Sequence, residues 1–295
     1  IPKPSELKTQ PLTQLRVTAF KEYLACEYRF WLNNVLKLSI SEDGATELDA
    51  KLFGTFMHSV LQRFGEQELM KSCSDVKEIE KFINISLDEV EKEKLGINNS
   101  AKISIQLELA RYRLKEFAKH QAQSVREGWK ILCTERFLTK ELKINGSTFT
   151  IRGTIDRVET NASGEIRVLD YKTGSITANK AHLTSKKWID LQLPLYRLLL
   201  TSIPELEGFD LSEENVSLGY FKIGDQESSS GIDLLEPKPE LNDLLEGFIE
   251  STIAAIIENK FSDTPVVPAP KFNEQFSWLC QDNSVIEELV GYTDE

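Results

Sequence analysis

The sequence lacks the features that would place a protein in a membrane or outside the cell. No run approaches the ~18 consecutive apolar residues that a membrane span needs. No basic start is followed by an apolar stretch and a small-residue cleavage site, so a secretory signal is not indicated. We therefore expect a cytoplasmic protein without a membrane partner.

Cysteine is scarce, and its spacing excludes a tight metal-binding pair. The 4 cysteines are far apart and form no Cys-x-x-Cys motif. In a cytoplasmic protein such spacing favours reduced, partly buried thiols over disulfides. These thiols belong to Cys26, Cys73, Cys133 and Cys280.

Internal repeats, low-complexity segments and a phosphate-binding loop are also missing. Without a Gly-x-x-x-x-Gly-Lys-Ser/Thr loop, the chain is not itself an ATP-driven helicase. Its 295 residues, 40% hydrophobic and 28% charged, are typical of one large globular domain or of one core with a helical addition. The first residue is Ile1 rather than Met, which suggests a fragment of a longer polypeptide.

The chain has a net negative charge, but the excess of acidic residues is confined to one part of the sequence. The net charge is −12, whereas residues 198–295 alone carry 21 Asp and Glu against 4 Lys and Arg. The first 197 residues therefore hold a positive excess, and the segment 171–197 is locally basic. Because phosphate affinity depends on local clusters, we expect DNA to bind near Lys180, Lys186 and Lys187, although lysines on a solvated face are an equally good interpretation.

The order of hydrophobic periodicities predicts an α/β fold, with a mixed central sheet flanked by helices and an α-helical N-terminal region. Four divisions are expected: an arm or linker (1–14), a helical region (15–128), a core (129–260) and a tail that packs on the core (261–295). Helices are predicted at 18–38, 48–70, 75–93, 100–127, 188–202 and 239–260. Strands are predicted at 130–138, 147–158, 166–172 and 215–223, and a short element near 285–290.

Two predicted strands each deliver a carboxylate to the same region. Asp156 lies in the strand over 147–158, and Asp170 lies near the end of the next. Lys172 follows Asp170 by two positions, so both side chains share one face of that strand. Two carboxylates suit Mg²⁺ or Mn²⁺, and a lysine beside them can assist an attacking water. Asp-x-Lys alone would favour a surface ion pair beside a turn.

The surrounding motifs favour the catalytic interpretation, because five of them resemble one family in order. They are the opening segment at 19–30, Gly-x-x-x-His at 54–58, Gly-x-Ile-Asp-Arg at 153–157, Leu-Asp-Tyr-Lys-Thr-Gly at 169–174 and Gln-x-x-x-Tyr at 192–196. Together they resemble the RecB-like and AddB-like nuclease domains of the PD-(D/E)xK, or restriction-endonuclease-like, superfamily.

The resemblance implies a role for each matching residue. The side chains of His58, Asp156 and Asp170, with the backbone carbonyl of Tyr171, would hold Mg²⁺ or, as a substitute, Mn²⁺. Lys172 would be the catalytic lysine. Gln192 and Tyr196 would support catalysis, since residues four apart on a helix can both face the lysine and the DNA backbone. For Glu135, contact with water at the metal and an ordinary exposed strand position remain open.

The sequence departs from several relatives that carry an iron–sulfur cluster. Those relatives use one early and three late cysteines, whereas this chain has Cys26 early and only Cys280 late. Two thiols do not supply the four ligands of a cluster. We therefore expect no cluster, with packing of the helical region against the tail in its place.

The resemblance implies a Mg²⁺-dependent, exonuclease-type deoxyribonuclease of DNA repair or recombination. Its partners would be DNA, as a single strand or a duplex end, and a helicase region or subunit, with this chain as the C-terminal module of a helicase-like protein. The alternatives are a catalytically inactive nuclease fold that binds DNA, and an interaction scaffold that uses the acidic tail. A scaffold would not explain five ordered motifs.

Overall fold

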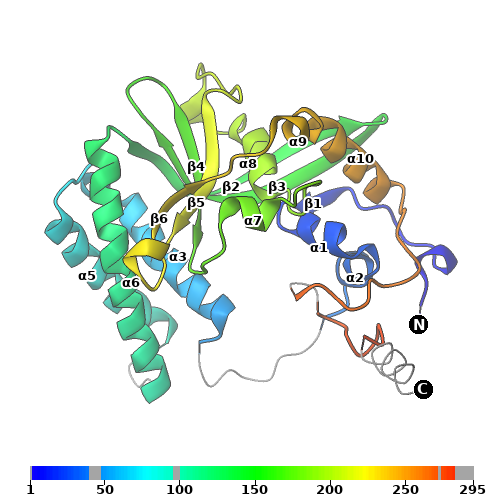
Figure 1. The fold of residues 1–295 in the computed structure, drawn as a ribbon, viewed down its shortest axis with the longest axis horizontal. Coiled ribbons are helices and arrows are strands. Elements are labelled where there is room, and N and C mark those ends of the chain that lie inside the picture. The colour runs from blue at the N-terminus through cyan, green and yellow to red at the C-terminus, as the bar shows by residue number, and fades with distance from the viewer. Residues whose placement is uncertain (1, 40–47, 96–99, 272–273, 283–295) are drawn as a thin grey trace.

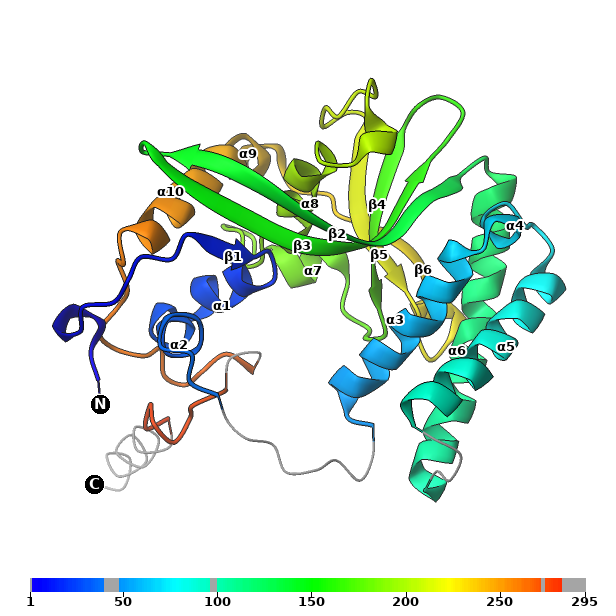
Figure 2. The ribbon, with the colours of Figure 1, turned by 180° about the vertical axis from the view of Figure 1, so that it is seen from behind.

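A mixed six-stranded sheet forms the centre of the protein, and helices cover both of its faces (Figures 1 and 2). The computed structural model describes residues 2–39, 48–95, 100–271 and 274–282. The strands are β1 (Gln14–Arg16), β2 (Lys130–Ile144), β3 (Ser147–Thr160), β4 (Ile166–Lys172), β5 (Val216–Lys222) and β6 (Gly231–Leu234). This architecture confirms the predicted α/β fold class with its helical N-terminal region.

One edge of strand β3 is only partly paired with other strands. Along its other edge, β2 pairs with it over the full length of the hairpin. On the open edge, β1 pairs in parallel with residues 150–152, and β4 pairs antiparallel with residues 157–160. Within the described residues, no strand pairs with residues 153–156 on that edge. The sheet therefore has a gap between β1 and β4 at the middle of β3.

Two separate apolar cores hold the helices on the two faces. Three long helices share a core with the ends of β4 and β5 on one face, and these are α3 (Ala50–Glu66), α5 (Val76–Lys94) and α6 (Ala101–Arg126). The other face is covered by α1 (Ala19–Ala25), α8 (Gln192–Leu200) and α10 (Leu245–Ile257). Figure 1 shows the first group together at one side of the sheet, and α8 and α10 across it.

Short elements complete the description. They are the 3-10 helices η1 (Pro4–Glu6), η3 (Pro204–Leu206) and η4 (Glu227–Ser229), the π-helix η2 (Trp31–Val35), and the helices α2 (Glu27–Phe30), α4 (Glu68–Lys71), α7 (Ala178–His182) and α9 (Pro239–Asp243). In the part of the chain that the structure describes, no helix combines the length and the apolarity needed to cross a bilayer.

The three long helices begin where capping residues satisfy their first free backbone N–H groups. The Asp49 carboxylate accepts from Leu52 N at 2.7 Å, and Asp75 accepts from Lys77 N at 2.8 Å. Ser100 Oγ accepts from Ile103 N at 3.3 Å. Such caps each stabilise a helix by about 1 kcal/mol, and they explain why the predicted starts lie within two residues of the observed ones.

The helix predicted over 18–38 is interrupted. Cys26 is extended, with φ −161°, and separates α1 from α2. At this break, Val266 N donates to Cys26 Sγ at 3.3 Å. Thr18 is at the N-cap position of α1, and its side chain makes no capping hydrogen bond.

Other boundaries also differ from the prediction. The β2–β3 hairpin continues to its turn at Asn145 and Gly146, both with positive φ, so β2 ends at 144 rather than 138. The helix expected over 188–202 begins only at Gln192, and the one over 239–260 is divided into α9 and α10. The sequence did not predict β1, β6 or α7.

Segments near the two ends of the chain pack together. Phe276 and Cys280 share an apolar cluster with Cys26 and residues of α2 and η2. The buried Arg29 guanidinium donates to Val266 O at 2.6 Å and forms an ion pair with Asp282. The element expected near 285–290 lies outside the described residues.

Candidate active site

The gap in the sheet opens into a cavity of about 440 Å³ that collects most of the predicted site residues. Alternate residues of β3 point into it, because side chains two apart in a strand share a face. Its lining includes six predicted site residues, which are His58, Asp156, Asp170, Lys172, Gln192 and Tyr196. The remaining lining residues come from β1, β2 and β3 and the turn before α1.

Asp156 is fixed by the backbone of the neighbouring strand. Its Oδ2 accepts from Tyr171 N at 2.7 Å, where β4 has separated from β3. The side chain is buried, and burial together with the nearby Asp170 raises the pKa of Asp156 well above its usual range. A carboxylate in such surroundings needs a positive partner.

His58 reaches this carboxylate from α3, on the other side of the gap. Its Nδ1 lies 3.1 Å from Glu135 Oε1 and 3.5 Å from Asp156 Oδ2, and its Nε2 lies 3.2 Å from Tyr171 O. Although burial lowers it, the Glu135 hydrogen bond and the Asp156 charge raise the pKa of His58 to about 9. The ring is therefore enclosed by acceptors from three different strands.

A glycine permits this approach of α3. A Cβ at Gly65 would lie 2.3 Å from Thr134 Cγ2, so the helix and β2 are in direct contact there. Gly65 is seven residues after His58, which places the two on nearly the same side of the helix. The contact at Gly65 therefore sets how closely His58 approaches the sheet.

Glu135, whose role the sequence left open, belongs to the cluster. Its backbone has φ +45°, a left-handed conformation that is uncommon for a non-glycine residue, and its neighbours in β2 pair with the two residues that flank Asp156. One ligand atom from each of His58, Glu135 and Asp156 lies within 4.8 Å of the others. Glu135 is therefore a candidate metal ligand.

Asp170 occupies the other side of the cavity, with the supporting residues around it. Its Oδ2 forms an ion pair with Lys172 Nζ. Its Oδ1 accepts from Gln192 Nε2 at 2.7 Å and from the Tyr196 hydroxyl at 3.4 Å. We expected Gln192 and Tyr196 to face the lysine and the DNA backbone. Their polar atoms contact Asp170, which pairs with Lys172, because α8 begins at Gln192 beside the end of β4, and their part toward DNA stays a prediction.

A second layer of polar residues, which the sequence did not reveal, lies behind Lys172. The lysine ammonium lies 5.4 Å from the centre of the Tyr220 ring. Burial lowers the pKa of His182, so its neutral ring accepts the Tyr220 hydroxyl at 2.9 Å and donates to Asp190 O at 3.0 Å. The Asp190 carboxylate in turn accepts from Gln192 N at 2.9 Å. This layer holds the catalytic candidates in place.

The donor set fits a divalent cation. Three carboxylates, Glu135, Asp156 and Asp170, meet in one buried region beside the Lys172 ammonium and the His58 ring, and the ring would bind a cation only in its neutral form. Carboxylate and carbonyl oxygens with one imidazole suit Mg²⁺ or Mn²⁺. His58, Glu135, Asp156 and the Tyr171 carbonyl are the groups placed to hold such an ion. Asp170 stands across the cavity, paired with Lys172, and its role as a metal ligand stays a prediction.

The three lysines predicted to bind DNA do not line the cavity. Lys180 is exposed on α7, and Lys186 and Lys187 are exposed in the loop after it. Their role stays a prediction. The cavity is instead lined by Arg16 and Arg152, which the sequence analysis did not single out.

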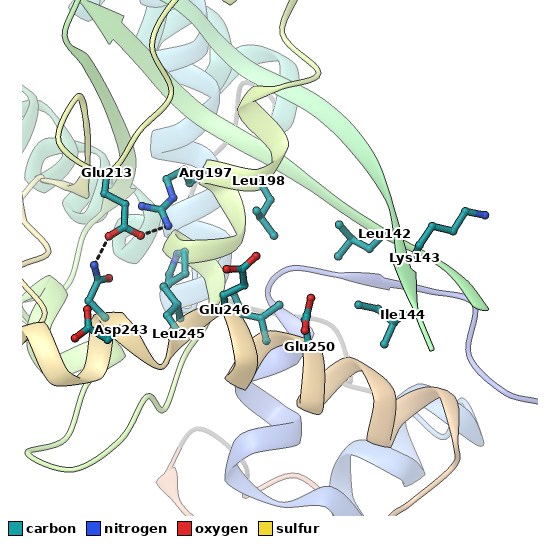
Figure 3. Close-up of a pocket in the computed structure, with 13 residues that line it drawn as sticks. Leu142, Lys143, Ile144, Arg197, Leu198, Glu213, Asp243, Leu245, Glu246 and Glu250 are labelled. Atoms are coloured by element: carbon teal, nitrogen blue, oxygen red, sulfur yellow. Dashed lines mark hydrogen bonds and ion pairs between the residues drawn. The ribbon is translucent and has the colours of Figure 1, made fainter. Parts of the chain in front are cut away.

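A second cavity, of about 470 Å³, is a weaker candidate for the site (Figure 3). It lies between the end of β2, α8 and α10, and four of its lining residues are carboxylates, namely Glu213, Asp243, Glu246 and Glu250. Its basic residues are Lys143 and Arg197, and Arg197 already pairs with Glu213. The carboxylates would repel a nucleic acid, and Figure 3 shows them spread along α9, α10 and the loop before β5.

Comparisons with known proteins show what this chain is similar to. An uncharacterized protein of Rickettsia felis is 29% identical over 222 residues, which are 70% of this chain and 24% of that protein. An ATP-dependent helicase/deoxyribonuclease subunit of Carboxydothermus hydrogenoformans is 25% identical over 250 residues, or 78% of this chain and 22% of that protein. The protein of the same name from Clostridioides difficile is 26% identical over 231 residues, or 71% of this chain and 19% of that protein.

This chain therefore spans about a fifth to a quarter of the length of the curated relatives that it matches. A solved structure of a candidate exonuclease from Eubacterium rectale aligns with 92% of this chain and 88% of its own, at 14% identity and a TM-score of 0.47. That similarity is too low to support an argument. The sequence profile of the PD-(D/E)XK nuclease superfamily matches residues 14–281, which include every residue of the cavity, and the chain belongs to that superfamily.

Proposed function

We propose that this chain is a metal-dependent deoxyribonuclease module that hydrolyses phosphodiester bonds in DNA, with Mg²⁺ as its cofactor and Mn²⁺ as a substitute. The observation that carries the proposal is the convergence of His58, Glu135, Asp156 and the Tyr171 carbonyl beside the Asp170–Lys172 ion pair. A purely structural cluster would not leave three carboxylates together next to an open cavity.

Each group has a defined task in this proposal. A divalent cation, when bound, would supply Lewis-acid polarisation of the phosphodiester and offset its negative charge. The Lys172 ammonium, exposed to the cavity on one side, donates hydrogen bonds to a water or a phosphoryl oxygen there. Gln192 and Tyr196 hold one oxygen of Asp170, and so fix the direction in which that carboxylate presents the other.

In the hydrolysis, a water oxygen forms a bond to phosphorus while the bond from phosphorus to one sugar oxygen breaks. The water proton passes to solvent or to the leaving oxygen, and the products are a phosphate end and a hydroxyl end. Lys172 stabilises the negative charge that develops on the phosphoryl oxygens. Lys172 needs no acid–base role to stabilise these oxygens, because its ammonium group is already positively charged.

The curated relatives support the proposed context. Two of them are named as helicase/deoxyribonuclease subunits, so we propose an exonuclease-type activity in DNA repair or recombination alongside a helicase region or partner chain, in the cytoplasm. The alternative is an inactive nuclease fold that only binds DNA. His58, Asp156, Asp170 and Lys172 all meet at the cavity, and this favours the active form.

Cleavage of a labelled DNA oligonucleotide across a Mg²⁺ and Mn²⁺ titration tests the proposal. Lys172→Ala should reduce cleavage by roughly 10²-fold or more, the scale of one lost electrostatic contact in a transition state, while DNA binding measured in Ca²⁺ stays near that of the wild type. Lys222→Ala is the matched control, because Lys222 is the register partner of Lys172 in β5 and does not line the cavity.

Two outcomes would contradict the assignment. If Lys172→Ala cut at the wild-type rate, the lysine would have no catalytic role. If the wild type bound DNA but never cut at any Mg²⁺ or Mn²⁺ concentration, the inactive-module alternative would replace the proposal.

A further inference from the structure

One face of the sheet carries an aromatic residue and two arginines next to the candidate site. Arg152, Thr154 and Asp156 alternate along β3, so their side chains share the cavity face. Phe137 stands opposite Thr154 in β2, and Arg16 stands opposite Arg152 in β1. Register partners project to the same side of a sheet, and all five residues line the cavity.

Phe137 is unusually exposed for a large apolar side chain. Its exposed fraction is 62%, although its neighbour Leu138 is buried on the opposite face of β2. By strand geometry it lies roughly 7 Å along the sheet from Asp156. An exposed aromatic ring at this distance from a catalytic centre offers a flat surface to a ligand rather than to the protein core.

The two arginines supply positive charge that the protein itself does not use. Arg152 Nε is buried, and within the described residues it has no hydrogen-bond partner. Neither Arg16 nor Arg152 forms an ion pair with any carboxylate of the described chain. The unpaired Arg152 Nε beside the cavity is free to donate to an anionic ligand, and the planar fork of arginine matches a phosphate.

We propose that this face is a track for single-stranded DNA, in which a base stacks on Phe137 while Arg16 and Arg152 contact backbone phosphates beyond it. The inference rests on the proposed nuclease function and names the form of its substrate. Stacking on an exposed ring needs an unpaired base, because both faces of a base inside a duplex are already covered by its neighbours. Arginines alone would bind either form, so Phe137 is the residue that selects the single strand.

Fluorescence anisotropy in Ca²⁺, with a labelled oligo-dT and a labelled blunt duplex, tests the track. Phe137→Ala should weaken oligo-dT binding about 10-fold, the scale of one lost base–aromatic stack, and should change duplex binding little. Phe137→Trp should retain the affinity for oligo-dT, and the added indole should be quenched when DNA binds. Tyr112→Ala is the matched control, because Tyr112 is 53% exposed on α6, which packs in the other core.

The arginines are tested by the salt dependence of oligo-dT binding. Arg16→Ala and Arg152→Ala should each reduce the slope of log K against log salt by about 0.7, the value for one phosphate contact on a single strand. Arg126→Ala, an exposed arginine at the end of α6, should leave the slope unchanged.

The outcomes separate this inference from the proposed function. An unchanged oligo-dT affinity in Phe137→Ala, or an equal loss for the duplex, would overturn the track even if the wild type cuts DNA. Phe137-dependent binding by a wild type that cuts nothing would support the track and defeat the nuclease assignment.

Discussion

Glu135 holds a backbone conformation that is costly in isolation. A non-glycine residue with φ +45° loses about 1 kcal/mol or more relative to an ordinary strand conformation. The conformation persists because the neighbouring pairs of β2 with β3 are intact on both sides and because Glu135 Oε1 contacts His58 Nδ1. Strain of this kind is common at functional sites, which agrees with the place of Glu135 in the ligand cluster.

Replacing the Glu135 carboxylate by an amide tests whether Glu135 is a metal ligand or only fills space beside the metal site. Glu135→Gln keeps the side-chain size but removes a negative charge beside Asp156, so we expect the Kd for Mn²⁺ to rise roughly 10-fold or more. Isothermal titration calorimetry with Mn²⁺ measures this change. Glu141→Gln, at an outward-facing position of the same strand, is the control and should bind Mn²⁺ like the wild type. Equal affinities for both variants would remove Glu135 from the ligand set.

At the scale of the element, α3 carries two glycines with opposite surroundings. A Cβ at Gly65 would overlap Thr134, whereas a Cβ at Gly54 would meet no atom within 4 Å. The first glycine is thus required by the contact between helix and sheet. The second only lowers the helix propensity, because glycine in a helix interior costs about 1 kcal/mol relative to alanine.

Alanine at these two positions should therefore change stability in opposite directions. Gly65→Ala should lower the free energy of unfolding by about 1–3 kcal/mol, the cost of an overpacked contact, and should move His58 away from Glu135. Gly54→Ala should raise it by up to about 1 kcal/mol. Urea denaturation of the two variants and the wild type measures both changes. A stable Gly65→Ala variant with unchanged Mn²⁺ affinity would contradict the role given to this contact.

The elements also show which features of the fold a sequence pattern can predict. The long helices and β4 were predicted because their apolar periods are local signals. By contrast, β1 is a three-residue strand whose pairing with β3 depends on a partner more than 130 residues away. The break at Cys26 lies where the thiol accepts from a backbone N–H of the distant C-terminal segment. Such contacts leave no periodic trace in the chain.

The residues of the candidate site likewise divide into those that the sequence predicted and those that it did not. His58, Asp156, Asp170 and Lys172 stand in motifs, and so they were found. Glu135 stayed open because its role depends on the approach of α3. Arg152 and Phe137 were missed because only strand register places them on one face. An arginine or a phenylalanine beside a motif gives no other signal in the sequence.

At the scale of the whole molecule, the acidic part of the chain and the candidate active site are separate. The acidic residues 198–295 contribute the carboxylates of the second cavity, at the end of β2 and on α9 and α10 (Figure 3). The candidate active site is built from α3, β2, β3 and β4 instead. The global charge of −12 therefore says little about the electrostatic potential at the gap in the sheet.

A cation bound by both His58 and Asp170, as the sequence predicts, would also join the two cores. His58 comes from the helices on one face of the sheet, while Asp170 is held by Gln192 and Tyr196 of α8 on the other. Binding to the folded state alone stabilises a protein by about 2.7 kcal/mol at a concentration 100-fold above the Kd. For a chain of this size, we expect Mn²⁺ at that concentration to raise the Tm by roughly 5 °C or more.

Two variants determine where this stabilisation arises. Asp156→Asn should abolish the rise in Tm, because it removes the carboxylate that stands between His58 and Tyr171. Glu250→Gln should retain it, since Glu250 belongs to the acidic second cavity. Differential scanning calorimetry with and without Mn²⁺ measures both. A rise that survives Asp156→Asn but disappears in Glu250→Gln would move the metal from the gap in the sheet to the acidic surface, and the catalytic assignment of the gap would then lose its cofactor.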